Sequence, residues 1–157
     1  MDTNPLFSKE EIDLAPGENV TADLETQKYL LFQSNQLLFG VIAESVVEII
    51  TNHDITPLPL LPPKIRGIIN LRGQIIPILD IRLLLGQEAS TGTCTIILNI
   101  DGTLLGILVD SVEKMLDIDA KTILPSPPQS NQELVSGMCS LADGQTMLVL
   151  DCPQLLR

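Results

Sequence analysis

The sequence predicts an all-β fold of two small five-stranded β-barrels related by a pseudo-twofold axis, with a few short helical turns. Two observations support this fold class. Apolar residues occur in short β-branched runs separated by Gly, Pro and Asn, as in strands of about four to eight residues, and not in long helical periods. The sequence also repeats itself once, which predicts two copies of one structural unit.

The internal repeat has a fixed spacing. Residues 29–50 align without a gap on residues 95–116, at an offset of 66, so that Gly40 falls on Gly106. The same offset places Pro59 on Pro125 in the connector that follows. A feature present in both copies is explained by the shared fold, whereas a feature present in one copy is free to serve function.

Residues 67–80 predict a β-hairpin, because Ile-rich runs flank Arg72-Gly73 and a tight turn needs a glycine with positive φ. The hairpin recurs at residues 137–151. We expect four residues to be structural or to line an interface: Gly67, Asn70, Gly73 and Asp80. Arg72 faces Ala142-Asp143 in the second copy, so its charge belongs to the first half alone. It is either a solvated turn residue or a partner contact.

The remaining segments are assigned in chain order. Residues 1–24 predict an acidic, disordered tail, and residues 25–157 predict one domain made of two repeat halves, 29–85 and 95–156. Residues 54–63 form a proline-rich connector. Residues 81–85 predict a helical turn capped by Asp80 and stopped by Gly86, and residues 152–156 predict a second turn.

Composition restricts the class of protein. The chain has 157 residues, of which 45% are hydrophobic, enough to bury a globular core. It lacks an apolar run of membrane-spanning length and a signal peptide, so we expect a cytoplasmic protein without direct membrane insertion. A net charge of −11 and 3% aromatic residues argue against nucleic-acid binding. A docking patch is predicted from four clustered cations: Lys64, Arg66, Arg72 and Arg82.

Catalytic and metal-binding patterns are missing from the sequence. Cys94, Cys139 and Cys152 are widely spaced and His53 is the single histidine, so we expect buried free thiols, no metal site and no cofactor. The most enzyme-like string is Asp110-Ser111-Val112, which is similar to the Asp-Ser-Gly loop of aspartic proteases with valine in place of glycine. We therefore expect no catalytic residues.

The motifs together resemble the CheW family of bacterial chemotaxis coupling proteins. The resemblance runs from Tyr29 to Leu156 and is most specific in residues 67–80. It is supported by residues 46–49, 55–59 and 106–112.

This resemblance implies a scaffold of two five-stranded β-barrels that couples the cytoplasmic tips of methyl-accepting chemoreceptors to the histidine kinase CheA. The kinase would be contacted through its own CheW-like regulatory domain. Receptor contact in the family involves positions that match Val46, Glu48 and Arg72. The protein would then be associated with the membrane only through receptor arrays.

Three alternatives remain open. The chain could be a CheW-like scaffold of a different signalling array, such as a type IV pilus pathway. It could be a free-standing homodimer whose proline-rich connector docks on a partner. It could also be a degenerate aspartic protease that uses Asp110.

Overall fold

The computed structural model describes residues 26–92, 94–126 and 134–156. The predicted tail lies outside the described residues. The chain divides into two compact units, which are described separately. The main unit comprises Lys28–Leu116 and Ile123–Arg157. Of the other unit, the structure describes residues 26–27 and 117–122, where Asp119 Oδ1 accepts a hydrogen bond from Lys121 N at 3.0 Å.

Nearly all regular structure is β, as predicted. The first repeat contains β2 (Thr26–Ser34), β3 (Leu37–Ile42), the 3₁₀ turn η2 (Ala43–Ser45), β4 (Val46–Thr51), β5 (Ile65–Leu71), β6 (Gln74–Asp80) and α1 (Ile81–Leu84). The second contains β7 (Cys94–Ile100), β8 (Thr103–Val109), β9 (Ser111–Asp119), η3 (Ala120–Thr122), β10 (Leu124–Pro125), β11 (Val135–Ser140), β12 (Thr146–Leu150) and η4 (Cys152–Leu156). Both predicted helical turns are present.

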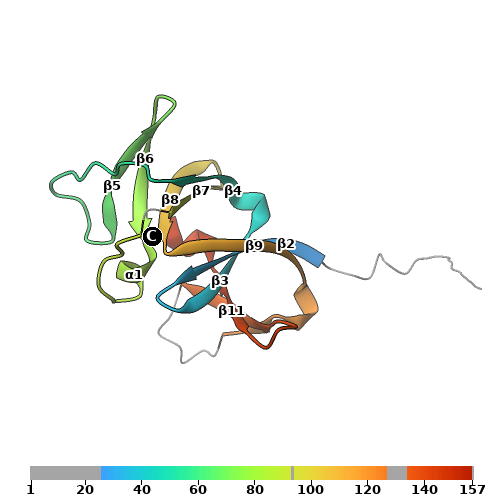
Figure 1. Ribbon diagram of the computed structural model, residues 1–157. Coiled ribbons are helices and arrows are strands. Elements are labelled where there is room, and N and C mark those ends of the chain that lie inside the picture. Colours follow the sequence, from blue (N-terminus) through green and yellow to red (C-terminus); the bar gives the residue numbers. More distant parts are fainter. Residues whose placement is uncertain (1–25, 93, 127–133, 157) are drawn as a thin grey trace, which may run out of the picture. The chain divides into compact units, whose positions relative to one another are not determined.

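The strands form two sheets, which confirms the predicted fold class (Figure 1). One has five strands in the order β4-β7-β8-β6-β5, and the other has six in the order β10-β11-β12-β3-β2-β9. The sixth strand is the two-residue β10. Its counterpart in the first repeat is a single bridge between Thr56 and Ile68.

Each sheet combines strands from both repeats. The halves are joined by two parallel pairings, in which Gly40 of β3 lies opposite Val149 of β12, and Gly106 of β8 lies opposite Ile78 of β6. These pairings occupy equivalent positions in the repeat. A Cβ on Gly40 would lie 2.4 Å from Met147 Sδ, and one on Gly106 would lie 2.6 Å from Ile78 Cδ1. The repeated glycines therefore make room for side chains of the strand that comes from the other half.

The alignment of Pro59 with Pro125 is wrong. Thr56 pairs with Ile68 and Leu124 pairs with Met138, so Pro57 is the structural equivalent of Pro125. The second copy has a longer strand before the connector, since β9 has nine residues and β4 has six. Because of the longer strand, the connector of the second copy lies two positions further along the chain than the offset of 66 predicts. An alignment without gaps cannot show this shift.

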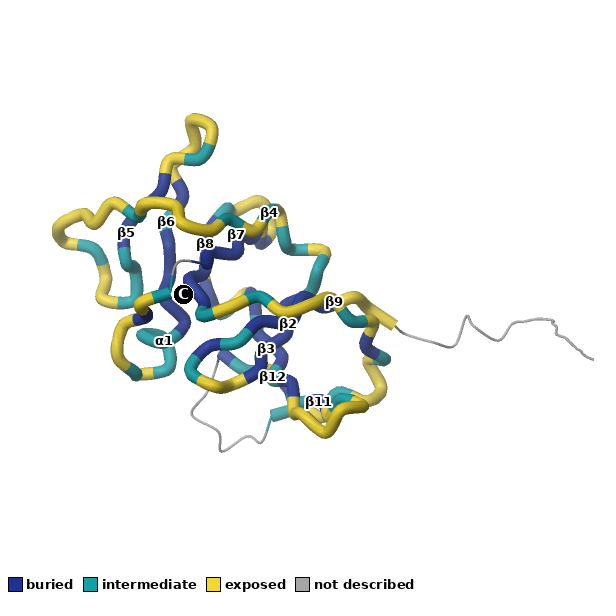
Figure 2. Tube along the Cα trace, in the orientation of Figure 1, coloured by how far each residue is buried: buried dark blue, intermediate teal, exposed yellow. Residues whose placement is uncertain are grey.

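The largest core cluster contains residues from strands of both sheets, including Phe32, Phe39, Ile96 and Ile107. A smaller cluster lies under the β5-β6 hairpin. Figure 2 shows buried strand centres and an exposed hairpin tip. The sheets thus hold the tip of the β5-β6 hairpin in solvent above a packed base.

Candidate partner-binding site on the arginine hairpin

The β5-β6 hairpin closes in a two-residue turn at Arg72-Gly73. Leu71 pairs with Gln74, and the turn residues have φ values of 52° and 87°. Positive φ at both central positions is the type I′ geometry that suits the twist of a hairpin. Gly73 N donates a hydrogen bond to Asn70 Oδ1 at 3.0 Å, which restrains the turn from within.

The base of the hairpin is anchored by packing. Ile69, Ile76 and Ile78 are buried in the smaller core cluster, together with Ile97 and Leu108 of neighbouring strands. Gly67 lies where the connector pairs with β5, and a Cβ there would lie 2.4 Å from Thr56 O. Arg72 therefore stands on a rigid support.

Arg72 forms an ion pair with Glu48 of β4. Its two terminal nitrogens, Nη1 and Nη2, donate to Oε1 and Oε2 of Glu48 at 2.9 and 3.0 Å, which is the bidentate geometry. The hydrogen bonds from Arg72 lower the pKa of Glu48, and the same bonds raise the pKa of Arg72. The arginine side chain is 71% exposed, so the pair is open to a partner.

The third residue predicted for partner contact is Val46, in the same strand as Glu48. It is half-buried and packs against the main core, and an irregularity in the β4-β7 register lies between the two residues. The structure therefore brings Glu48 and Arg72 into direct contact, while Val46 lies two positions before Glu48 in β4 and packs on the core.

Sequence reasoning missed exposed apolar residues on β4 and β6. Val47 is 52% exposed, Ile49 is 40% exposed and Ile75 is 61% exposed. On β4 the strand alternation was a usable signal, because the residues flanking Glu48 must point to the opposite face. On β4 the exposed apolar side chains therefore lie on the face opposite Glu48.

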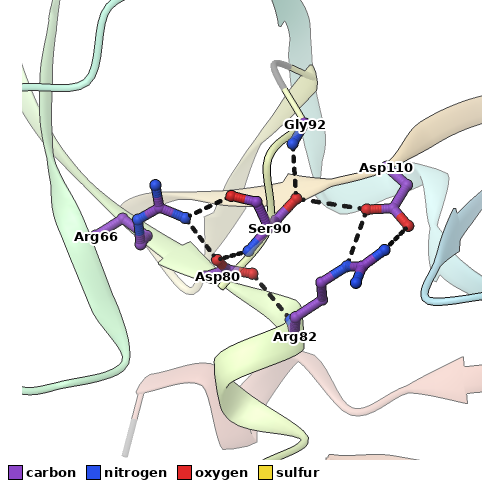
Figure 3. A network of polar contacts seen from close by, with 6 residues as sticks. All are labelled: Arg66, Asp80, Arg82, Ser90, Gly92 and Asp110. Atoms are coloured by element: carbon purple, nitrogen blue, oxygen red, sulfur yellow. Dashed lines mark hydrogen bonds and ion pairs between the residues drawn. The ribbon is translucent and has the colours of Figure 1, made fainter. Parts of the chain in front are cut away.

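Asp80, the last residue of the hairpin, is part of a polar network at the opposite end from the turn (Figure 3). It has no exposed surface. Its carboxylate accepts hydrogen bonds from Arg66 Nη1 at 2.8 Å, Ser90 N at 2.8 Å and Arg82 N at 2.9 Å. Asp80 therefore caps α1 and fixes the segment before β7.

Asp110, which follows β8, completes this network. Arg82 donates to it from Nε at 3.2 Å and from Nη2 at 2.7 Å, and Asn35 N donates at 2.8 Å. The hydrogen bonds from Arg82 lower the pKa of Asp110 most strongly. Since Asn35 connects strands of the six-stranded sheet and Arg82 follows β6, Asp110 ties the two sheets together.

Three of the four cations in the predicted docking patch form ion pairs within the chain. Arg66 pairs with Asp80, Arg72 with Glu48, and Arg82 with Asp110. The partners are 14 to 28 positions apart in the chain, so charge clustering in the sequence could not show that these cations are neutralised.

The other candidate reactive groups are structural or isolated. Cys94, Cys139 and Cys152 are buried and form no disulfide, and burial raises the pKa of the Cys152 thiol to about 11. Within residues 26–92, 94–126 and 134–156, no group of three or more His, Cys, Asp or Glu could hold a metal ion. No helix in this part of the chain is long and apolar enough to cross a membrane.

Comparison with known proteins identifies the family. A CheW-like domain model matches residues 28–157. A protein named Chemotaxis protein CheW from Klebsiella aerogenes is 31% identical over 150 residues, covering 91% of this chain and 89% of its own. Protein FrzA from Myxococcus xanthus is 32% identical over 118 residues, covering 73% and 74%.

A solved structure shares the fold. The scaffolding protein TtCheW from Thermoanaerobacter tengcongensis superimposes with a TM-score of 0.74 at 31% identity, covering 80% of this chain and 88% of the other. The family match spans more than half the chain and agrees with the two related sheets and the arginine hairpin. The chain therefore belongs to the CheW-like domain family.

Proposed function

We propose that the chain is a non-catalytic cytoplasmic adaptor of bacterial chemotaxis, which couples chemoreceptors to the histidine kinase CheA. Membership of the CheW-like family supports this function, as does the similarity to proteins named for chemotaxis and for scaffolding. The observation that carries the proposal furthest is the rigid hairpin that displays Arg72 in solvent. A scaffold needs such a preformed contact surface more than a reactive cleft.

The receptor contact is assigned to Val46, Glu48 and Arg72. A guanidinium has five N–H donors, and the ion pair with Glu48 engages two nitrogens of Arg72. The remaining donors can bind a carboxylate of a partner without loss of the internal pair. The exposed apolar residues Val47 and Ile49 lie on the opposite face of β4 from Glu48 and are not part of this contact.

The absence of catalysis is supported by the state of Asp110. An aspartic protease needs two carboxylates that share a proton. Here the guanidinium of Arg82 contacts both oxygens of Asp110 and holds its pKa below the usual range. A carboxylate held in this way is a poor proton carrier, so its role is structural.

The adaptor role is tested by capture on two partners. The chain should bind a CheA regulatory domain and a chemoreceptor cytoplasmic fragment, separately and together in one complex. Failure to bind either partner at low salt would overturn the proposal. We expect no peptidase activity in the parent, and therefore no difference in peptidase assays between the parent and Asp110→Asn.

Arg72→Ala tests the receptor contact. We expect receptor affinity to fall about 30-fold, as at an interface hot spot, while CheA binding is unchanged. The melting temperature should fall by less than about 4 °C, since an exposed ion pair contributes little to stability. Unchanged receptor affinity would show that other residues carry the contact.

A charge exchange separates the two roles of Arg72. The double variant Glu48→Arg/Arg72→Glu can rebuild the internal ion pair with reversed positions. If the pair only supports the fold, the double variant binds the receptor like the parent. If Arg72 also contacts the receptor, the double variant should melt like the parent but bind the receptor more weakly than the parent does.

A second assignment is that the chain serves a different chemosensory array. The similarity to Protein FrzA favours it, because that relative does not carry the CheW name. Receptor fragments from each signalling pathway of the same cell would discriminate the two assignments. The chain serves the array whose receptor fragment binds the parent and loses affinity for the Arg72→Ala variant.

A further inference from the structure

The two copies of the β-hairpin lead into equivalent aspartates. Asp80 is the last residue of β6 in the first repeat, and Asp151 directly follows β12 in the second. Their backbone N–H groups donate to equivalent carbonyls at the start of each hairpin, Asp80 N to Lys64 O at 3.2 Å and Asp151 N to Leu134 O at 2.8 Å. The fold therefore places the two carboxylates at matching points of the two repeats.

The cation beside the first of these carboxylates is replaced by a serine in the second repeat. Arg66 lies at the register irregularity between β5 and β6, and its Nη1 donates to Asp80 Oδ2 at 2.8 Å (Figure 3). Ser136 lies at the matching irregularity between β11 and β12. The other arginine near Asp80, Arg82, likewise corresponds to Pro153. The second repeat thus keeps the acid of the ion pair and lacks its base.

The carboxylate of Asp151 is half-buried. In the part of the chain that the structure describes, no hydrogen bond or ion pair reaches it. Burial raises the pKa of the neighbouring Cys152 thiol, and the negative charge of Asp151 raises it further. A carboxylate that is partly removed from water in this way gains from a charged donor, because hydrogen bonds between ionised groups are the stronger kind.

Asp151 and Ser136 line one pocket of about 270 Å³. Ile42, Val149 and Leu150 give it an apolar wall. Among the described residues that line it, Asp151 alone is charged. Since the matching residues of the first repeat are Arg66 and Asp80, the pocket corresponds to the place where the Arg66 side chain meets its carboxylate. It offers a wall for a carbon chain and one anion for a cation.

We propose that this pocket binds the guanidinium group of an arginine side chain that another protein presents. The stem of the arginine lies along the apolar wall and its N–H groups donate to Asp151, as those of Arg66 donate to Asp80 in the first repeat. A guanidinium is weakly hydrated and matches the shape of a carboxylate, which suits a half-buried site. A free amino acid fits less well, because the described lining residues offer its carboxylate no cation.

Titration of the full chain with n-butylguanidinium, followed by NMR of the backbone amides, tests the pocket. The amides of Ser136, Asp151 and Cys152 should shift and saturate, and 1-butanol and n-butylammonium should bind more weakly. Asp151→Asn should weaken binding by about tenfold or more, since a charge-assisted contact is lost. Glu113→Gln is the matched control, because it removes the same charge at an exposed position and should bind like the parent.

Ser136→Arg copies the first repeat and supplies the cation from within the chain. This variant should melt no lower than the parent and should no longer bind n-butylguanidinium, because its own side chain reaches Asp151. Asp151→Asn should melt within a few degrees of the parent, so that its loss of binding is not a loss of folding. The two variants thus remove the same binding in opposite ways, one by taking away the anion and the other by pairing it.

Blocked and free forms of arginine distinguish the source of the guanidinium. N-acetyl-L-argininamide, which resembles a residue within a peptide, should bind more tightly than free L-arginine. Tighter binding of the free amino acid overturns the assignment to a protein partner. The proposal is also overturned if n-butylguanidinium shifts no amide of the pocket, if 1-butanol or n-butylammonium binds as tightly, or if Asp151→Asn or Ser136→Arg binds the probe like the parent.

Discussion

Arg72 shows how one residue depends on both its backbone and its side-chain partner. Its positive φ belongs to the type I′ turn, and its guanidinium reaches Glu48, 24 positions earlier in the chain. The second copy of the hairpin has Ala142-Asp143 at this place and therefore lacks the cation. Comparison of the two hairpins shows that the fold requires a tight turn at this place but does not require an arginine.

The carboxylate of Asp110 gives the stability of the protein a pH dependence. Its pKa in the folded chain is lowered, chiefly by Arg82, whereas in the unfolded chain it returns to about 3.9. The contribution is therefore present above the unfolded pKa and is lost as pH falls through the folded pKa. Below the folded value both states are protonated and the contribution is gone.

Asp110→Asn should remove this contribution. We expect a loss of roughly 1 to 3 kcal/mol at pH 7, because hydrogen bonds to a charged group are lost and Arg82 is left unpaired. Urea denaturation at a series of pH values measures it. Parent and variant should differ most at neutral pH and converge in acid below the ordinary pKa of aspartate. A constant difference across that range would show that the ion pair does not act through protonation.

The hairpin is the element in which two glycines serve different purposes. Gly67 lies against the connector, where a Cβ would lie 2.4 Å from Thr56 O and 2.9 Å from the Ile55 side chain. A Cβ on Gly73 would have no atom within 4 Å, but φ at this position is 87°. Gly67 is limited by space and by its φ of 156°, whereas Gly73 is limited by backbone conformation alone.

Alanine substitution should distinguish these two positions. Gly67→Ala must displace the connector backbone, with an expected loss of about 2 kcal/mol or more of unfolding free energy. Gly73→Ala meets open space and should lose about 1 kcal/mol through conformational strain alone. Chemical denaturation of both variants gives the comparison. Backbone strain acts at both positions, so an equal loss would mean that the steric clash at Gly67 adds nothing because the connector yields.

Local patterns in the sequence predicted the elements well. The Ile-rich runs predicted β5 and β6, Asp80 predicted the cap of α1, and the glycines marked the turns. Such local patterns could not predict contacts between residues that are far apart in the chain. The contact of Arg82 with Asp110 depends on which strands are neighbours, and the sequence repeat does not state that its halves exchange strands.

The exchange of strands determines how the main unit folds as a whole. β3 of the first repeat pairs with β12, and β6 pairs with β8, so each half depends on strands of the other. The largest core cluster likewise contains residues from both repeats, such as Phe39 and Ile107. Each half alone would expose that apolar surface and the edges of its strands to water.

Separated halves should therefore be unfolded and should recover structure when combined. We expect fragments cut in the segment before β7, residues 26–92 and 93–157, to lack cooperative melting alone. An equimolar mixture should regain the β-sheet circular dichroism of the intact chain and melt cooperatively at a temperature that rises with concentration. Arg82→Gln in the first fragment is a matched control, because it weakens the tie to Asp110 across the cut and should lower the affinity between fragments. A fragment that melts cooperatively by itself would show that one repeat is a domain in its own right.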